Sequence, residues 1–144
     1  MSLITSTENA ALLDAGRLAT ELAQRYRYSI DHLIEPESLC RLLGRRSDEL
    51  EALAETLADI ARNAGLLPRE PDLEMSELRT LADQFSSWLD DDTCSKLLER
   101  LAESERELLD ELATARDNAK SERNRVLHQA REDTQNFLDR LAER

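Results

Sequence analysis

The residues between positions 36 and 64 carry apolar side chains at alternating steps of four and three. This is the heptad spacing of helices that pack along one another at a shallow angle. Gly65 follows as a left-handed helix stop. One charged residue interrupts the series, which reads Leu39, Leu43, Arg46, Leu50, Leu53, Leu57, Ile60 and Ala64. The pattern predicts a long helix that buries one face along its whole length.

The whole chain has the composition of long helices rather than of a sheet. Leu, Ala, Glu and Arg are abundant, aromatic residues make up 3%, and only 3 Gly and 3 Pro interrupt the 144 residues. A chain of this length suits a single domain, which buries roughly 68–70% of its unfolded surface. We therefore expect one all-α domain over residues 1–144.

Five helices are predicted along the chain. They cover about residues 6–33, 36–64, 71–89, 94–118 and 121–141. Thr5 and Glu8 have the capping-box spacing for the first helix. Asp92 or Thr93 is expected to cap the fourth. A break is placed near Asn118, because an unbroken final helix would be unusually long for a compact domain.

The first four predicted helices form two hairpins, joined by a connector that contains Pro68 and Pro71. Two such hairpins make an antiparallel four-helix bundle. The helix expected at 121–141 has a thinner apolar stripe, made of Leu127, Ala130, Phe137 and Leu141. We therefore expect it to be an additional C-terminal helix, docked outside the bundle or against another chain.

Charge and targeting signals narrow the classes of function. The formal net charge of -12 argues against binding to nucleic acid or to an anionic membrane, since both need a concentrated basic face. The first ten residues lack the pattern of a signal peptide, and no apolar run approaches the roughly 20 residues of a membrane span. Cys40 and Cys94 lie 54 positions apart, which favours two isolated thiols over a disulfide or a metal site. We expect a cytoplasmic bacterial protein.

A carboxylate stands on the apolar seam of the fourth predicted helix, which reads Leu98, Leu101, Glu105, Leu108 and Leu112. Glu105 is a metal ligand, half of a buried ion pair, or an edge residue that bends out to water. The pair with Arg46 is favoured, because Arg46 is the other charged residue on a clean seam position. Their levels differ by about one helical turn, which a long Arg side chain can span. Tyr26 is expected to fill the core, with a hydrogen-bonding role near a metal as the alternative.

Three short segments carry a resemblance to a known superfamily. They are ADIARNAGLLP at the end of the second predicted helix, the acidic turn DDDT, and AESERELLDEL around Glu105. With these segments the chain resembles the ferritin-like superfamily, and more narrowly a bacterial family of ferritin-like proteins of unknown function. The resemblance implies a four-helix fold more strongly than an activity.

A di-metal centre is the specific hypothesis that the resemblance raises. Ferritin-like di-iron sites take Glu from two helices and a Glu-x-x-His pair from each of the other two. The two predicted hairpins align at an offset of 56 residues, which places four carboxylates at roughly one height: Glu21, Glu49, Glu77 and Glu105.

The imidazole ligands of such a centre are missing from the sequence. Ala52 and Leu108 stand where Glu-x-x-His would place histidine, and the two histidines, His32 and His128, lie far from that level. Carboxylates alone can still bind a hard divalent ion such as Mn or Ca. We expect no cofactor, with Fe or Mn bound by the four carboxylates as the alternative.

Two classes of function follow. The favoured one is a non-enzymatic bundle that acts by association, as a homo-oligomer or as a module that binds a protein partner. No Ser–His–Asp spacing or phosphate-binding loop is present, and two His and two Cys offer little for catalysis at neutral pH. The alternative is a carboxylate-rich metal-binding protein of ferritin type, acting as an oxidoreductase or in storage.

Overall fold

The computed structural model describes residues 6–32, 37–71, 91–116 and 121–143. Within these ranges the protein has four helices and no strand: α1 (Thr7–His32), α2 (Glu37–Asn63), α4 (Asp91–Thr114) and α5 (Glu122–Ala142). The helices predicted at 6–33, 36–64, 94–118 and 121–141 are therefore confirmed, with ends displaced by a few residues. The helix predicted at 71–89 lies almost entirely outside the described residues.

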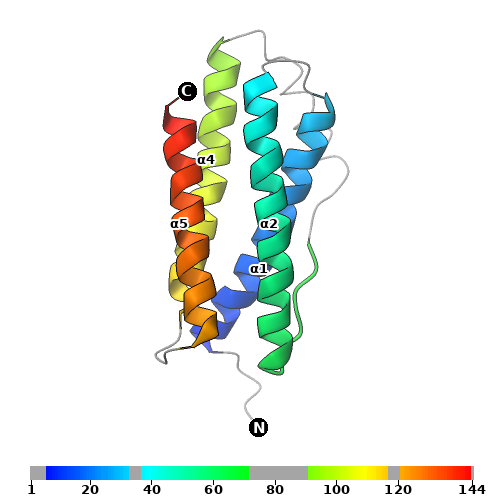
Figure 1. Cartoon of the computed structure of the whole chain (residues 1–144), viewed down its shortest axis with the longest axis vertical. Helices are drawn as coiled ribbons and strands as arrows, with labels where there is room; N and C mark the ends of the chain where they lie inside the picture. The colour runs from blue at the N-terminus through cyan, green and yellow to red at the C-terminus, as the bar shows by residue number, and fades with distance from the viewer. Residues whose placement is uncertain (1–5, 33–36, 72–90, 117–120, 144) are drawn as a thin grey trace.

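The four helices stand side by side as a bundle (Figure 1). α1 packs against both α2 and α4, and α5 packs against α4 and touches α2 over a short stretch only. α1 and α5 run in one direction, while α2 and α4 run in the other (Figure 1). Each helix is therefore antiparallel to its direct neighbours. Because α2 and α4 are parallel, the end of α2 and the start of α4 lie at opposite ends of the bundle.

The last helix, α5, belongs to the core. Its buried residues are Leu127, Ala130, Thr134, Phe137, Leu138 and Leu141. The expectation that this helix docks outside the bundle or on another chain is therefore wrong. Its apolar stripe looked thin because Thr134 was not counted in it. The hydroxyl of Thr134 donates to the carbonyl of Ala130 at 2.7 Å, so this polar side chain can be buried within its own helix.

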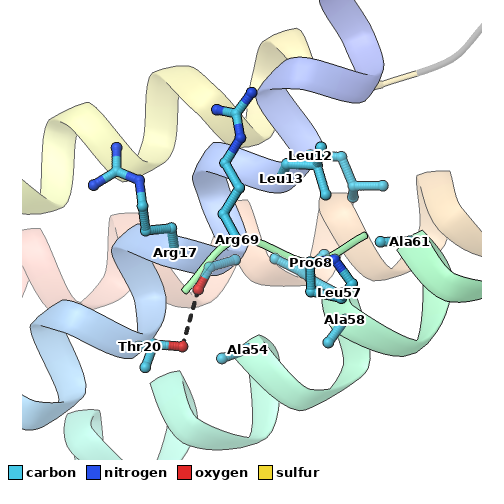
Figure 2. Close-up of a pocket in the computed structure, with 11 residues that line it drawn as sticks. Leu12, Leu13, Arg17, Thr20, Ala54, Leu57, Ala58, Ala61, Pro68 and Arg69 are labelled. Carbon is cyan, nitrogen blue, oxygen red and sulfur yellow. Dashed lines mark hydrogen bonds between the residues drawn. The ribbon is translucent and has the colours of Figure 1, made fainter. Parts of the chain in front are cut away.

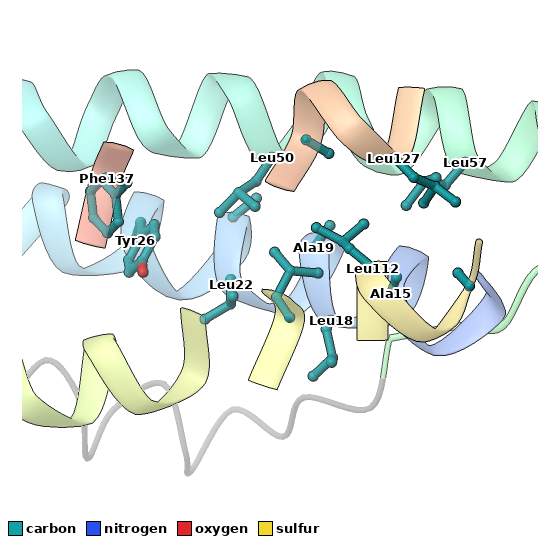
Figure 3. Close-up of a cluster of buried hydrophobic side chains, with 14 of the residues drawn as sticks. Ala15, Leu18, Ala19, Leu22, Tyr26, Leu50, Leu57, Leu112, Leu127 and Phe137 are labelled. Atoms are coloured by element: carbon teal, nitrogen blue, oxygen red, sulfur yellow. The ribbon is translucent and has the colours of Figure 1, made fainter. Parts of the chain in front are cut away.

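α1 has a broad buried face on which small alanines lie among larger Leu side chains (Figure 3). Ala15, Ala19 and Ala23 are at most 1% exposed, so neighbouring helices approach α1 closely. At Gly16 an added Cβ would stand 3.8 Å from Cβ of Leu57 on α2. Burial of one Leu side chain contributes roughly 1.5–3 kcal/mol, so the layers of Leu around α1 dominate the stability of the fold.

The helix ends follow local sequence signals. The hydroxyl of Ser6 accepts the backbone N–H of Asn9 at 3.1 Å and caps α1. Thr5, the cap predicted from the sequence, lies outside the described residues. Ser121 caps α5 in the same way by accepting the N–H of Asn124. The caps expected for the fourth helix at Asp92 or Thr93 are wrong, because α4 already begins at Asp91.

The end of α2 confirms the role predicted for Gly65. This residue has φ of 77°, in the left-handed region that glycine adopts without a steric penalty. The N–H of Leu66 donates to the carbonyl of Ala61 at 2.8 Å, and the N–H of Gly65 donates to that of Arg62 at 2.9 Å. These two bonds are a Schellman motif, which satisfies carbonyls that the helix end leaves free.

The connector after α2 lies over the groove between α1 and α2 (Figure 2). Arg69 forms an ion pair with Asp14 on α1, and Pro68 and Arg69 line a cavity of about 50 Å³ with Gly16.

Arg123, at the start of α5, connects the region after α4 to the start of α1. Its guanidinium donates to the carbonyl of Ala115 at 2.8 and 3.0 Å and to the side chain of Asn9 at 2.9 Å.

In the four described ranges, no helix combines the length and the apolar character that crossing a membrane requires.

Candidate functional site

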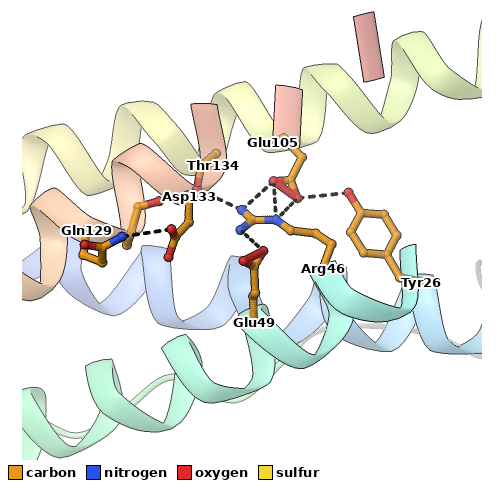
Figure 4. Close-up of polar contacts among 8 residues, drawn as sticks. Tyr26, Arg46, Glu49, Glu105, Gln129, Asp133 and Thr134 are labelled. Carbon is orange, nitrogen blue, oxygen red and sulfur yellow. Dashed lines mark hydrogen bonds and ion pairs between the residues drawn. The ribbon is translucent and has the colours of Figure 1, made fainter. Parts of the chain in front are cut away.

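The centre of the bundle contains a polar layer to which every described helix contributes one side chain. We call it the central layer: Tyr26 of α1, Arg46 of α2, Glu105 of α4 and Thr134 of α5 (Figure 4). All four residues are at most 2% exposed. The layer lies within a mainly apolar core, so its polar groups must be satisfied by partners within the protein.

Arg46 and Glu105 form the ion pair at the heart of this layer. Nε of Arg46 donates to both carboxylate oxygens of Glu105 at 3.1 Å, and Nη2 donates to Oε2 at 2.7 Å. The two residues come from α2 and α4, whose backbones do not pack directly against each other. The long Arg side chain therefore spans the middle of the bundle, and the carboxylate of Glu105 compensates its charge.

Tyr26 and Thr134 complete the hydrogen bonds of the pair. The hydroxyl of Tyr26 donates to Oε1 of Glu105 at 3.0 Å, and Thr134 accepts from Nη2 of Arg46 at 2.8 Å. The ring of Phe137 lies 5.4 Å from the guanidinium carbon and 5.9 Å from the ring of Tyr26. An aromatic face at that distance attracts a cation. The guanidinium is thus held on three sides.

The outer edge of the layer faces a pocket between α2 and α5. Nη1 of Arg46 lies 3.4 Å from Oε1 of Glu49, a side chain that is 47% exposed. The pocket has a volume of about 150 Å³ and also contacts Asp133, Asn136 and Arg140. Its lining residues come from α2 and α5, which pack over a shorter stretch than the other neighbouring helices described. Arg46 and Glu49 line the pocket, while neither Glu105 nor Tyr26 does.

The protonation states of Tyr26 and Arg46 are unsuited to proton transfer at neutral pH. Burial, followed by the charge of Glu105, raises the pKa of Tyr26 well above its usual value of 10.0. Burial lowers the pKa of Arg46, but the hydrogen bond and the charge of Glu105 outweigh it, and the pKa is raised above its usual value. A general acid or base works best with a pKa near the operating pH. Tyr26 and Arg46 therefore act as fixed donors.

The four carboxylates considered as metal ligands have different surroundings. Glu105 is enclosed in the central layer, and Glu49 lies at its edge beside Arg46. Glu21 is buried, but Nη1 of Arg17 donates to both its oxygens, at 2.9 and 3.2 Å. Glu77 lies outside the described residues. Among the residues that the structure describes, no group of three or more His, Cys, Asp or Glu has the arrangement of a metal site.

Sequence reasoning brought Arg46 and Glu105 together but missed three of the residues that contact them. The direct bond from Tyr26 to Glu105 was not foreseen, and Thr134 and Phe137 were not placed near Arg46. A signal for Thr134 exists in the sequence, because Ala130, Thr134 and Phe137 follow one another in steps of four and three. A Thr on such a seam must find buried partners.

No family model, no curated protein and no solved structure matches this chain. Function is therefore inferred from the residues of the chain itself.

Proposed function

We propose that this protein is a non-catalytic helical bundle that acts by association with another protein chain, either a second copy or a different partner. One observation carries the proposal: the interior polar groups that chemistry would use are bound to one another. The carboxylate of Glu105 accepts bonds from Arg46 and Tyr26, and Arg46 donates its remaining bonds to Thr134 and Glu49. A substrate or an ion at the centre would have to displace these contacts.

The proposal includes a bundle of ferritin-like type. The parallel arrangement of α2 and α4, with a long connection between them, supports this, since one long crossover is the connectivity of ferritin-like folds. In this proposal the guanidinium of Arg46 takes the place of a metal ion as the cation that neutralises Glu105. Leu108, at a position where a ferritin-like site would carry histidine, is fully buried and packs as an apolar residue.

One exposed apolar residue on the surface is a candidate contact for the proposed association. Leu67, in the connector after α2, is 86% exposed and is the large apolar side chain that stands free in the described part of the chain. Its neighbour Leu66 packs against the core, so the position of Leu67 on the surface is held. Single exposed apolar residues are common on folded proteins, so Leu67 is a position at which to test the association and is not itself the argument for it.

Metal content and mass together test the proposed function. We expect protein purified without chelator or affinity tag to contain no stoichiometric Fe or Mn. We also expect its mass in sedimentation equilibrium to rise with concentration above the 16.4 kDa of one chain. Leu67→Ser should lower the association, whereas the exposed control Glu70→Gln should not. A monomer at every concentration that holds stoichiometric metal, lost in Glu105→Ala, would contradict the proposal.

A further inference from the structure

A second polar pocket lies between the end of α4 and the first half of α5, away from the central layer. It has a volume of about 130 Å³, far above the roughly 10–15 Å³ that one water molecule needs. Its lining residues are Leu112, Arg116, Asn124, Leu127, His128 and Arg131. We call it the arginine pocket.

Helical spacing explains why these side chains meet. Asn124, His128 and Arg131 stand four and three residues apart on α5, so they share one face. Leu112 and Arg116 are four residues apart at the end of α4, next to that face. Leu112 and Leu127 are at most 1% exposed and form an apolar floor. The polar groups thus stand around a rigid base, as a binding pocket requires.

The charge of the arginine pocket is opposite to that of the chain. The sequence has a net charge of -12, yet no acidic residue is among the described residues that line this pocket. Glu132 contacts Nε2 of His128 at 3.0 Å from the exposed surface, but it does not line the pocket. Two Arg side chains next to each other repel unless an anion lies between them. The pocket therefore has the electrostatics of an anion site.

Arg131 supplies an independent observation. Its Nε is buried and has no hydrogen-bond partner, and it is the one buried side-chain nitrogen or oxygen in this state among the described residues. Other Arg side chains pair with carboxylates, as Arg17, Arg27, Arg46, Arg62 and Arg69 do. A buried donor without an acceptor is costly, and a bound oxyanion would satisfy it.

We propose that the arginine pocket binds a small oxyanion, a phosphate or a carboxylate, through the guanidinium groups of Arg131 and Arg116. Guanidinium groups match the geometry of such anions, because two parallel N–H donors reach two oxygens. Asn124 and His128 would lie beside the ligand, and Leu112 and Leu127 would contact it at the apolar side of the pocket. This binding is separate from the proposed association, because it uses neither the connector after α2 nor the central layer.

Isothermal titration calorimetry on the full chain tests the proposal, with inorganic phosphate and acetate as the two probes at constant ionic strength. Chloride serves as the reference anion. Ionic strength is fixed because exposed charges are screened beyond about 8 Å at 0.15 M salt. We expect phosphate or acetate to bind with one ligand per chain and to raise the midpoint of thermal unfolding. Tighter binding of inorganic phosphate would identify the ligand as a phosphate, and tighter binding of acetate would identify it as a carboxylate.

Two variants and a matched control locate the site. Arg131→Met and Arg116→Gln should each weaken binding by about tenfold or more, the loss expected for a charge-assisted hydrogen bond. Arg140→Met also removes one Arg from α5, but Arg140 lines the other pocket, so binding should be unchanged. Arg116 is exposed, so its variant keeps the test valid if Arg131→Met fails to fold. Equal responses to phosphate, acetate and chloride, or equal binding by all variants, would overturn the proposal.

Discussion

Two neighbouring levels of the same bundle are stabilised in different ways. Arg46 and Leu50 are four residues apart on α2, and both are at most 2% exposed. Around Leu50 the core is apolar (Figure 3), whereas at the level of Arg46 each of the four described helices contributes a polar side chain (Figure 4). Apolar packing is non-directional and tolerates exchange of similar side chains. The central layer needs each partner in its place, so it selects which positions of the four helices meet.

The largest effect is expected in the central layer. Arg46→Met removes the partner of a fully buried carboxylate, and we expect the free energy of unfolding to fall by roughly 3–5 kcal/mol. Chemical denaturation followed by circular dichroism measures this loss. A loss below about 1 kcal/mol would show that the pair is solvated and that the contrast between the two levels is unfounded.

A double variant separates the cost of leaving Glu105 unpaired from the net contribution of the ion pair to the free energy of unfolding. Replacing Arg46 by Met and Glu105 by Leu together leaves no buried charge. We expect it to recover at least about 2 kcal/mol of the loss, because well-packed apolar residues often replace buried ion pairs without penalty. No recovery would mean that the hydrogen bonds of the layer, rather than charge compensation, hold the four helices.

The apolar level should respond almost as strongly but by another mechanism. Leu50→Ala leaves a cavity, and we expect a loss of about 2–5 kcal/mol. Leu50→Met, which conserves the volume, should cost less than about 1.5 kcal/mol. Equal losses for the two substitutions, measured by urea denaturation, would contradict a purely apolar role for this position.

Tyr26 tests the hydrogen bond to the carboxylate alone. Tyr26→Phe keeps the ring beside Phe137 and removes the donor to Glu105. We expect a loss of roughly 1.5–3 kcal/mol, the range for hydrogen bonds to charged groups. Tyr28→Phe, two residues along α1, provides a matched control that leaves the central layer intact. A loss no larger than that of the control would remove Tyr26 from the layer.

The raised pKa of Tyr26 predicts a dependence of stability on pH. Above pH 10 the unfolded chain loses the phenolic proton while the folded protein keeps it, because the folded pKa lies well above 10.0. The unfolded state then binds fewer protons, so stability must fall with rising pH, by up to about 1.4 kcal/mol per pH unit from this group. The decline begins at the unfolded pKa. Thermal melts between about pH 8 and pH 11 should show it, and Tyr26→Phe should lack this component.

The smallest effect is expected on the surface. Arg27 lies 2.9 Å from Glu51 and 3.2 Å from Asp48, but all three side chains are more than half exposed. Arg27→Gln should change the free energy of unfolding by less than about 1 kcal/mol, because water and salt screen such pairs. A loss comparable to that of Arg46→Met would show that burial does not explain the strength of the central ion pair.

Much of the fold could be predicted because helix periodicity and helix ends are local properties. The heptad seam from Leu39 to Ala64 predicted α2, and Gly65 predicted its end through a left-handed backbone. The seam position of Glu105 likewise marked a carboxylate that needs compensation. These signals lie within one or two helical turns, where spacing along the chain fixes spacing in space.

The roles of α5 and Thr134 could not be predicted in this way. A stripe of few apolar residues does not show which neighbours complete its burial, and α5 was placed outside the bundle for that reason. The two partners that the sequence left unassigned, Tyr26 for Glu105 and Thr134 for Arg46, are separated from them by 79 and 88 residues along the chain. Separations of that size carry no periodic signal.

The sequence by itself determined the four described helices, the end of α2 at Gly65 and the two charged seam positions, because each depends on neighbours in the chain. Only the tertiary structure decided which helices surround the central layer and which groups satisfy Arg46. It also left the Nε of Arg131 buried beside a pocket without an acceptor. Burial and pairing arise where separate helices meet, so no single helix carries that information.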